Sequence, residues 1–350
     1  MNLFLKILLY PFAILYDLVT SIRNHAYEKG YSKSILFDIF TINVGNLTVG
    51  GTGKTPQIEY LIRLLKDKFE TATLSRGYGR KTKGFILANA ESSATQIGDE
   101  PMQMYSKFGS EVTVAVGENR VFAVPSILSA KPNTQTILLD DAFQHRPIKS
   151  HLNILLSDYN RPFYKDFLLP LGRLRESRSG AKRADIVIVS KCPKDLNHSE
   201  MDLIKKEIKR YAKPQIAIFF TAIRYAKPLS VYRNDTELTS SDIYLLSGIA
   251  NAKPLISQVS ENYTLLHHNE KQDHFQYNLE TLKEIKTDFE KYENKNKAIL
   301  TTEKDAIKLQ TASFKELLQE IPIFYLPIEV YFLENQKEFD EKVLGSLKAD

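Results

Sequence analysis

The sequence predicts an α/β fold with a mostly parallel sheet, followed by a smaller C-terminal α/β domain and preceded by an apolar N-terminal helix. After about residue 35, short β-branched runs alternate with helical patterns, and a polar stretch near residues 228–237 separates two such series. Residues 3–22 form the most apolar stretch of the chain. We therefore expect a helical segment over residues 1–30, a core over 31–225 and a smaller domain over 226–350.

The composition is that of a globular protein with a slight excess of positive charge. Of 350 residues, 43% are hydrophobic and 25% are charged, which excludes disorder or a coiled coil as the main organisation. Lys and Arg exceed Asp and Glu by 47 to 42, which favours an anionic partner. Because the chain has no Trp and no module of interleaved basic and aromatic residues, we expect no nucleic-acid partner. The single Cys192 excludes a disulfide framework and a cysteine-based zinc site.

The N-terminal segment has a wide apolar face and a narrow polar stripe. The polar or small residues of the stripe recur at steps of three, four or seven: Asn2, Lys6, Ala13, Asp17, Thr20, Ser21 and Asn24. This pattern is typical of a helix in a membrane interface, and the cations that follow over residues 23–33 suit anionic headgroups. A helix packed on the protein core is the alternative. A transmembrane span is less favoured because it would place Lys6 and Asp17 inside the membrane. A signal peptide is less favoured because no small-residue cleavage site follows the apolar stretch.

The strands are predicted from apolar, β-branched runs. The first series comprises residues 38–44, 71–75, 112–116, 136–140, 153–157, 185–190 and 215–220, and the second comprises 243–247, 263–266, 298–302 and 323–326.

Residues 41–55 (TINVGNLTVGGTGKT) join an apolar strand to a helix through a glycine-rich loop. Glycine lets backbone N–H groups approach an anion, and the N-terminus of the following helix points at the same place. Thr48 replaces the first glycine of the strict phosphate-loop pattern, but the strand–loop–helix context is complete. We predict a P-loop NTPase core that binds a nucleoside triphosphate through Gly50, Gly51, Thr52, Gly53, Lys54 and Thr55.

An acidic pair ends a second apolar strand. Residues 136–141 read TILLDD, so Asp140 or Asp141 is expected to face a Mg²⁺ ion that the Thr55 hydroxyl also ligates.

Two further segments offer the groups that a kinase needs for its acceptor hydroxyl. GDEP at residues 98–101 contains Asp99, and QDHF at 272–275 contains His274, which titrates near neutrality and suits a proton relay. His267 and His268 lie near His274, but the spacing matches no zinc pattern.

Several arginines lie in glycine-containing loops, in SRGYGR (75–80), ENR (118–120) and LGRLRESR (171–178). Arginine binds phosphate through two parallel hydrogen bonds, so these loops are candidates for holding a phosphorylated substrate. The candidate substrate-binding residues are Arg76, Tyr78, Arg120, Gln144, His145 and Arg175.

Taken in order, these motifs resemble the tetraacyldisaccharide 4′-kinase (lipid A 4′-kinase) family over nearly the whole chain. The resemblance rests on an N-terminal helix with Tyr16, Arg23-Asn24 and Tyr27, and on GNLTVGGTGKTP (45–56), SRGYGR, GDEP, LDDAFQH (139–145), LPLGRLRES (169–177), SGIAN (247–251), DHF (273–275) and TTEKDAIKL (301–309). Ala142 stands where the family usually has Gly, and Arg173 where Pro is common.

The resemblance implies transfer of the ATP γ-phosphate, with Mg²⁺, to the 4′-hydroxyl of a tetraacylated glucosamine disaccharide 1-phosphate, which forms lipid IVA in lipid A biosynthesis. It implies Asp99 as the base, paired with His274, and Lys54 as the third catalytic residue. It further implies a β-linker between a P-loop core and a smaller domain that closes the cleft, and a peripheral location at the cytoplasmic face of the inner membrane of a Gram-negative bacterium. No obligate protein partner is expected.

Two other functions are compatible with a phosphate loop behind an apolar helix. A membrane-associated switch ATPase carries a second lysine in its phosphate loop, where this chain has Val49. A P-loop kinase for another small acceptor is the third possibility. Dependence of ATP consumption on the acylated lipid separates these functions.

Overall fold

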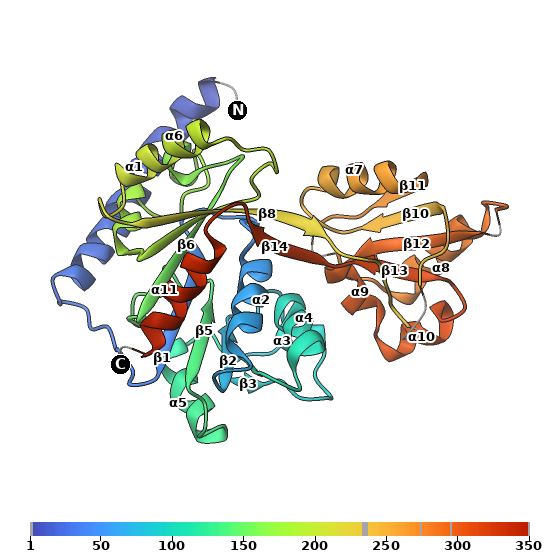
Figure 1. The fold of residues 1–350 in the computed structure, drawn as a ribbon, viewed down its shortest axis with the longest axis horizontal. Coiled ribbons are helices and arrows are strands. Elements are labelled where there is room, and N and C mark those ends of the chain that lie inside the picture. The colour runs from blue at the N-terminus through green and yellow to red at the C-terminus, as the bar shows by residue number, and fades with distance from the viewer. Residues whose placement is uncertain (1–2, 233–236, 274, 295, 349–350) are drawn as a thin grey trace.

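The computed structural model describes residues 3–232, 237–273, 275–294 and 296–348. Two β-sheets, each covered by helices on both faces, form two lobes that lie side by side (Figure 1). The predicted α/β fold is confirmed.

The large sheet has the strand order β14-β8-β7-β6-β1-β5-β2-β4-β3 within the described residues. Its strands are β1 (Phe40–Asn46), β2 (Thr71–Ser75), β3 (Ile86–Leu87), β4 (Thr113–Val116), β5 (Thr136–Asp140), β6 (Leu152–Asp158), β7 (Ile186–Ser190), β8 (Ala217–Tyr225) and β14 (Ile328–Phe332). β3 and β14 pair antiparallel with their neighbours, and the other strand pairs are parallel. Strands buried on both faces need apolar residues throughout, which is why β7 reads IVIVS without alternation.

Helices cover both faces of this sheet. α2 (Lys54–Leu65), α4 (Asp99–Phe108) and α11 (Gln336–Lys348) pack on one face, and α5 (Arg120–Ala130) and α6 (His198–Lys209) pack on the other. Short helices complete the lobe: α3 (Ala94–Ile97) and the 3₁₀ helices η1 (Phe163–Lys165) and η2 (Arg178–Arg183).

The small sheet has the order β11-β10-β12-β13-β9 within the described residues. Its strands are β9 (Leu229–Ser230), β10 (Asp242–Ser247), β11 (Thr264–Glu270), β12 (Lys297–Thr302) and β13 (Ile323–Leu326). α7 (Lys253–Asn262) packs on one face, and α8 (Leu279–Glu290), α9 (Glu303–Leu309) and α10 (Ala312–Leu318) pack on the other.

An antiparallel pair of strands, β8 and β14, joins the two lobes (Figure 1). β14 follows β13 after Pro327, leaves the small sheet and pairs with β8 from Ile328 opposite Tyr225 to Phe332 opposite Thr221. α11 then packs into the core of the large lobe through Phe339 and Val343. The expected range 226–350 for the smaller domain therefore differs from the structure, because β14 and α11 belong to the large lobe.

The N-terminal segment is one helix, α1 (Leu3–Glu28), which lies along the large lobe (Figure 1). Ala13 and Thr20 of the predicted polar stripe are buried against the protein. The large apolar side chains on the other sides are exposed: Phe4, Leu5, Ile7, Leu8, Tyr10, Phe12, Ile14, Leu15, Leu18, Val19 and Ile22. The alternative of a helix whose apolar face packs on the core is therefore wrong. By length and composition alone, residues 4–28 would also suffice to cross a membrane.

Candidate active site

Most of the predicted site residues follow strands that end at one edge of the large sheet. β1 is parallel to β5, with Val44 opposite Asp140, and β2 is parallel to β5 as well. The loops after these strands, and after β4 beside β2, therefore open at the same edge. In open α/β sheets this carboxyl edge is where ligands bind.

The loop between β1 and α2 has the backbone of a phosphate-binding loop. Gly50 and Gly53 have φ angles of 105° and 84°, in the left-handed region that glycine adopts without strain. Gly53 caps α2, so the N–H groups of the first turn of α2 point outward at this loop. Inside the loop, the Asn46 side-chain amide donates to the Thr52 hydroxyl at 2.9 Å.

Side chains at the ends of β6 and β7 hold this loop in place. The Ser190 hydroxyl donates to the carbonyl of Thr52 at 2.7 Å, and Lys191 contacts the carbonyl of Gly51. Lys191 also pairs with Asp158 at 2.8 Å. These contacts hold the carbonyl groups of Gly51 and Thr52 toward the ends of β6 and β7, and no backbone hydrogen bond is made by the N–H groups of residues 50–53 within the described part of the chain.

The loop also touches the LGRLRESR segment. The N–H of Val49 donates to the carbonyl of Arg173 at 2.8 Å, and the N–H of Arg175 donates to the carbonyl of Leu47 at 2.7 Å. The N–H of Arg173 donates to Asp166 at 3.3 Å, a bond that the proline common in the family cannot make. These two backbone contacts fix the segment against the phosphate loop.

Asp140 and Asp141 have different surroundings. Asp140 is buried, and burial and the nearby Glu100 raise its pKa, although Lys54 lowers it. Asp141 accepts from Arg175 Nη1 at 3.0 Å through both oxygens and lies 3.8 Å from Lys54 Nζ.

The acidic pair fits a hard divalent cation. Asp140 Oδ1 is buried and has no hydrogen-bond partner among the described residues. A cation beside this oxygen would offset the desolvation of the carboxylate. No group of three or more His, Cys, Asp and Glu side chains forms a metal cage in the described part of the chain. Mg²⁺ suits such a site, because it is usually held by one or two carboxylates together with phosphates and water.

Three arginines surround His145. Burial, followed by the charges of Arg120, Arg76 and Arg23, lowers the pKa of His145 to about 4, so the imidazole is neutral at pH 7. Arg120 is only 3% exposed and donates to the carbonyl of Asp140 at 3.4 Å. Burial lowers the pKa of Arg120 as well. Cations gathered around a neutral histidine favour an anionic ligand.

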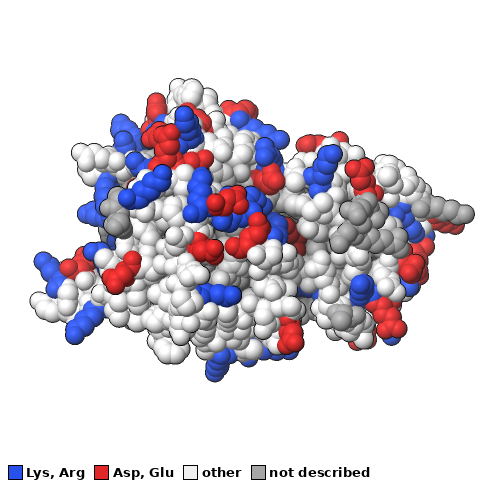
Figure 2. All heavy atoms as spheres, turned by 60° about the horizontal axis from the view of Figure 1, so that its bottom comes forward, with Lys and Arg blue, Asp and Glu red and all other residues white. Residues whose placement is uncertain are grey.

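One face of the molecule carries a mixture of basic and acidic side chains. On the face drawn in Figure 2, basic and acidic side chains are interspersed, and neither sign forms one broad patch.

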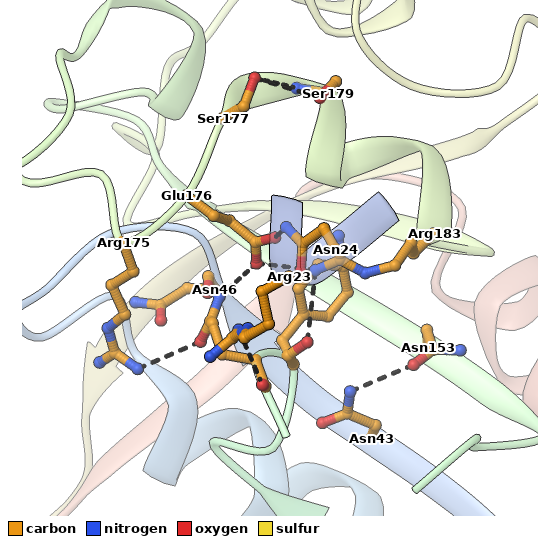
Figure 3. Close-up of polar contacts among 12 residues, drawn as sticks. Arg23, Asn24, Asn43, Asn46, Asn153, Arg175, Glu176, Ser177, Ser179 and Arg183 are labelled. Atoms are coloured by element: carbon orange, nitrogen blue, oxygen red, sulfur yellow. Dashed lines mark hydrogen bonds and ion pairs between the residues drawn. The ribbon is translucent and has the colours of Figure 1, made fainter. Parts of the chain in front are cut away.

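α1 is attached to the site by hydrogen bonds around Glu176 (Figure 3). Glu176 is buried and accepts from Asn24 at 2.8 Å, from Gln144 at 2.9 Å and from Arg183 at 2.7 Å. The Tyr16 hydroxyl donates to the carbonyl of Arg175 at 2.9 Å. The polar stripe of α1 thus binds the same segment that contacts the phosphate loop.

A cavity of about 620 Å³ opens beside this attachment. It lies between the end of α1 and η2, and its lining includes Ile22, His25, Tyr31 and Arg183. Apolar and basic groups therefore face a common space next to α1.

Asp99 is the first residue of α4 and lies at the boundary between the lobes. The backbone of Gly98 passes so close to Tyr78 that a Cβ at Gly98 would lie 2.9 Å from the Tyr78 carbonyl oxygen. This brings the GDEP and SRGYGR segments together, with the Tyr78 side chain exposed. Asp99 is buried and pairs at 3.2 Å with Lys308, which comes from α9 of the small lobe.

The structure thus gathers many of the predicted residues. Arg76 and Arg120 lie near enough to His145 for their charges to lower its pKa, and Arg175 donates to both Asp141 and Gln144. His274 lies outside the described residues. The sequence analysis missed Glu176, Lys191 and Lys308 as partners of site residues. Glu176 and Lys308 stand in motifs quoted for the resemblance, but nothing in their spacing indicates which groups they contact.

Comparisons with known proteins show the family of the chain. The family profile described as tetraacyldisaccharide-1-P 4′-kinase (LpxK) matches residues 5–348. The chain is 45% identical to the tetraacyldisaccharide 4′-kinase of Flavobacterium psychrophilum, covering 99% of this chain and 98% of that protein. It is 41% identical to the Bacteroides thetaiotaomicron protein of the same name, covering 98% and 93%. A crystal structure of LpxK from Aquifex aeolicus in complex with ATP superimposes with a TM-score of 0.75 at 28% identity, covering 98% of this chain and 99% of that one. The chain therefore belongs to the tetraacyldisaccharide-1-P 4′-kinase family.

Proposed function

We propose that this protein transfers the γ-phosphate of ATP to the 4′-hydroxyl of a tetraacylated glucosamine disaccharide 1-phosphate, the reaction that forms lipid IVA. The observation that carries this proposal is the attachment of an apolar helix and a glycine-rich loop to one shared segment. The segment at Arg173–Arg175 bonds to the loop on one side and to Tyr16 of α1 on the other. A phosphate donor and a lipid acceptor would therefore meet at this segment, and the family relationship supports the same reaction.

On the donor side, the N–H groups of the loop and the Lys54 ammonium hold the β- and γ-phosphates. Thr55 and Asp140, with Asp141 beside them, would hold Mg²⁺, which when bound neutralises charge on the phosphates. Lys54 also stabilises the charge that develops during transfer, because it is positioned before the reaction starts.

On the acceptor side, Asp99 accepts the proton of the 4′-hydroxyl group, with His274 as its partner in a relay. The hydroxyl oxygen forms a bond to the γ-phosphorus, and the bond from that phosphorus to the bridging oxygen of ADP breaks. ADP leaves with the electron pair, the sugar gains the phosphoryl group, and the proton stays on the Asp99–His274 pair.

The cationic space around His145 would hold an anionic group of the lipid. Arg76 and Arg120 supply charge, and Tyr78, Gln144 and Arg175 lie in adjoining segments that supply donors. A phosphate fits such a space because guanidinium groups match its geometry.

The first test is ATP consumption with and without the detergent-solubilised tetraacyl disaccharide 1-phosphate. We expect ADP release to depend on the lipid and to match formation of the 4′-phosphorylated product. ADP release at the same rate without lipid would indicate a switch ATPase instead.

We further propose that α1 holds the protein peripherally at the cytoplasmic face of the bacterial inner membrane. Its exposed apolar face would lie among the acyl chains, and its polar stripe stays on the protein.

Deleting residues 2–22, or changing exposed Ile14 and Leu18 to Asp, should abolish flotation with anionic vesicles and leave ATP affinity nearly unchanged. Leu203→Asp, at an equally exposed position on α6, is the control. Full vesicle binding by the deletion variant would place the anchor elsewhere.

A further inference from the structure

Three segments of the small lobe meet around the side chain of Lys308. Lys308 lies on α9 and is buried, and its ammonium donates to the carbonyl of Phe275 at 3.0 Å. Asp305, one turn earlier on α9, is fully buried and lies 3.9 Å from the same ammonium. Asp305 is itself fixed, because it accepts from the N–H of Gly248 at 2.8 Å and from the Thr302 hydroxyl at 2.7 Å. Phe275 and Asp305, the latter fixed by Gly248 and Thr302, therefore hold this ammonium in one place.

The ammonium of Lys308 reaches out of its own lobe. Its nitrogen lies 3.2 Å from Asp99 Oδ2, at the N-terminus of α4 in the large lobe. Asp99 is also buried, so this pair is largely shielded from water and the attraction between ammonium and carboxylate is stronger than at an exposed site. Only the charged carboxylate can accept a proton.

We propose that Lys308 is a positioning residue for the reaction, which holds the Asp99 carboxylate in the orientation and charge state needed for proton transfer. This inference rests on the proposed role of Asp99 as the base. Lys308 comes from the small lobe, so the acceptor side is complete only when the two lobes are docked. A misplacement of a reacting group by about 1 Å can cost roughly a hundredfold in rate, so the effect should be large.

A second lysine, Lys107, forms an ion pair across the same boundary between the lobes but not with Asp99. A variant of Lys107 therefore distinguishes a loss of lobe docking from a loss of Asp99 positioning. Lys107 of α4 pairs with Glu59 of α2 at 2.6 Å and with Glu303 of α9. Gln103 donates to the same two carboxylates at 2.8 and 3.0 Å. Loss of Lys107 therefore weakens lobe docking and leaves the contacts of Lys308 in place.

The experiment compares Lys308→Met, Lys308→Gln, Lys308→Arg and Lys107→Met in the full chain, with ATP and the tetraacyl disaccharide 1-phosphate. We expect Lys308→Met and Lys308→Gln to lower kcat about a hundredfold while the Kd for ATP changes less than about threefold. Lys308→Arg, which keeps the charge, should recover most of kcat. Lys107→Met should change kcat less than about fivefold, with its effect mainly on KM and thermal stability. Lys308→Gln keeps a donor for the Phe275 carbonyl, so it serves if Lys308→Met does not fold.

Two results would overturn the proposal. One is an unchanged kcat in Lys308→Gln, and the other is an equal loss of kcat in Lys308→Gln and Lys107→Met. Asp99→Ala is measured in parallel: if its kcat is nearly normal, the proposed base is wrong, whereas a strong loss in Asp99→Ala beside a normal Lys308→Gln refutes only the positioning role. Adding Lys308→Gln to Asp99→Ala should cause no further loss of kcat, because the positioned group is already absent.

Discussion

The donor side and the acceptor side of the site differ in how the chain builds them. Asp140 ends β5, and Lys54 begins α2 after the glycine-rich loop that follows β1, the parallel neighbour of β5 in the large sheet. Asp99 lies at the start of a helix, and Lys308 of the other lobe contacts it. The donor side is therefore complete within one lobe, whereas the acceptor side depends on the contact between two lobes.

In the proposed mechanism, this difference would limit hydrolysis of ATP. ATP binding would need only the large lobe, whereas proton transfer would also need Lys308 of the small lobe. Phosphoryl transfer would then be linked to lobe docking, in the way that closure completes other kinase sites. Variants on the two sides should therefore separate into those that change ATP or Mg²⁺ binding and those that change only kcat.

The largest expected effect is on the acceptor side. Asp99→Ala and His274→Ala should each lower kcat about a hundredfold to a thousandfold, because a positioned base contributes about that much. The Kd for ATP and the Mg²⁺ requirement should persist, as nucleotide titrations would show. The double variant should lose much less than the product of the two losses, because the residues act as one relay. A raised Mg²⁺ requirement in Asp99→Ala, or a fully multiplicative loss, would move the base to Glu100 or Asp141.

On the donor side, Lys54→Ala should lower kcat by roughly a hundredfold or more, equivalent to about 3 kcal/mol of transition-state stabilisation. Unlike Asp99→Ala, it should also weaken ATP binding, because Lys54 contacts phosphates in the ground state. Steady-state kinetics and a fluorescent nucleotide displacement assay measure the two effects. A loss of less than about tenfold would show that the glycine-rich loop is not the phosphate site.

Asp140→Asn should have a smaller effect that depends on the cation. The amide keeps the shape of the carboxylate but removes its charge, so the Mg²⁺ concentration for half-maximal activity should rise about tenfold or more. Raising Mg²⁺ should restore part of the rate. An unchanged Mg²⁺ dependence would assign the cation to Asp141 instead.

The sequence predicted the parts that depend on local pattern. The expected strand 136–140 matches β5, and 71–75 matches β2, because both runs are rich in β-branched or apolar residues and are buried along their whole length. The glycines and the lysine of residues 50–54 predict a phosphate loop, and the structure gives Gly50 and Gly53 the positive φ angles that such a loop uses. The two-residue strands β3 and β9 are too short to carry any periodic signal.

The contacts between distant segments could not be predicted in this way. β14 directly follows β13 in sequence, and only the tertiary structure shows that it pairs with β8 instead of staying in the small sheet. Glu176 and Lys308 read as ordinary charged residues, because the sequence does not reveal that Asn24 or Asp99 will lie against them. Which side chains meet across the two lobes depends on how the whole chain folds, and no local sequence pattern records it.

The smallest predicted effect concerns Glu303, which lies in the contact between the two lobes on which the acceptor side depends. Glu303 is buried in the lobe contact, and burial, then the charge of Glu59, raises its pKa to about 7 although Lys107 lowers it. A carboxyl with a pKa above its unfolded value of 4.5 binds more protons in the folded state, so its contribution to stability falls as the pH rises from about 4.5 through 7. Above pH 7 the folded protein carries the cost of a buried charge.

Glu303→Gln should therefore raise the melting temperature at pH 8 by a few degrees, since the cost removed is about 1 to 3 kcal/mol. At pH 5 the wild-type carboxyl is mostly protonated in the folded state, so the variant and the wild type should melt at nearly the same temperature. Calorimetry at both pH values measures the difference. Glu111→Gln, which alters an exposed ion pair with Lys66, should shift the melting temperature little at either pH. If Glu303→Gln melts at a lower temperature than the wild type at pH 8, the ion pair of the charged Glu303 with Lys107 stabilises the lobe contact by more than the burial of the carboxylate costs.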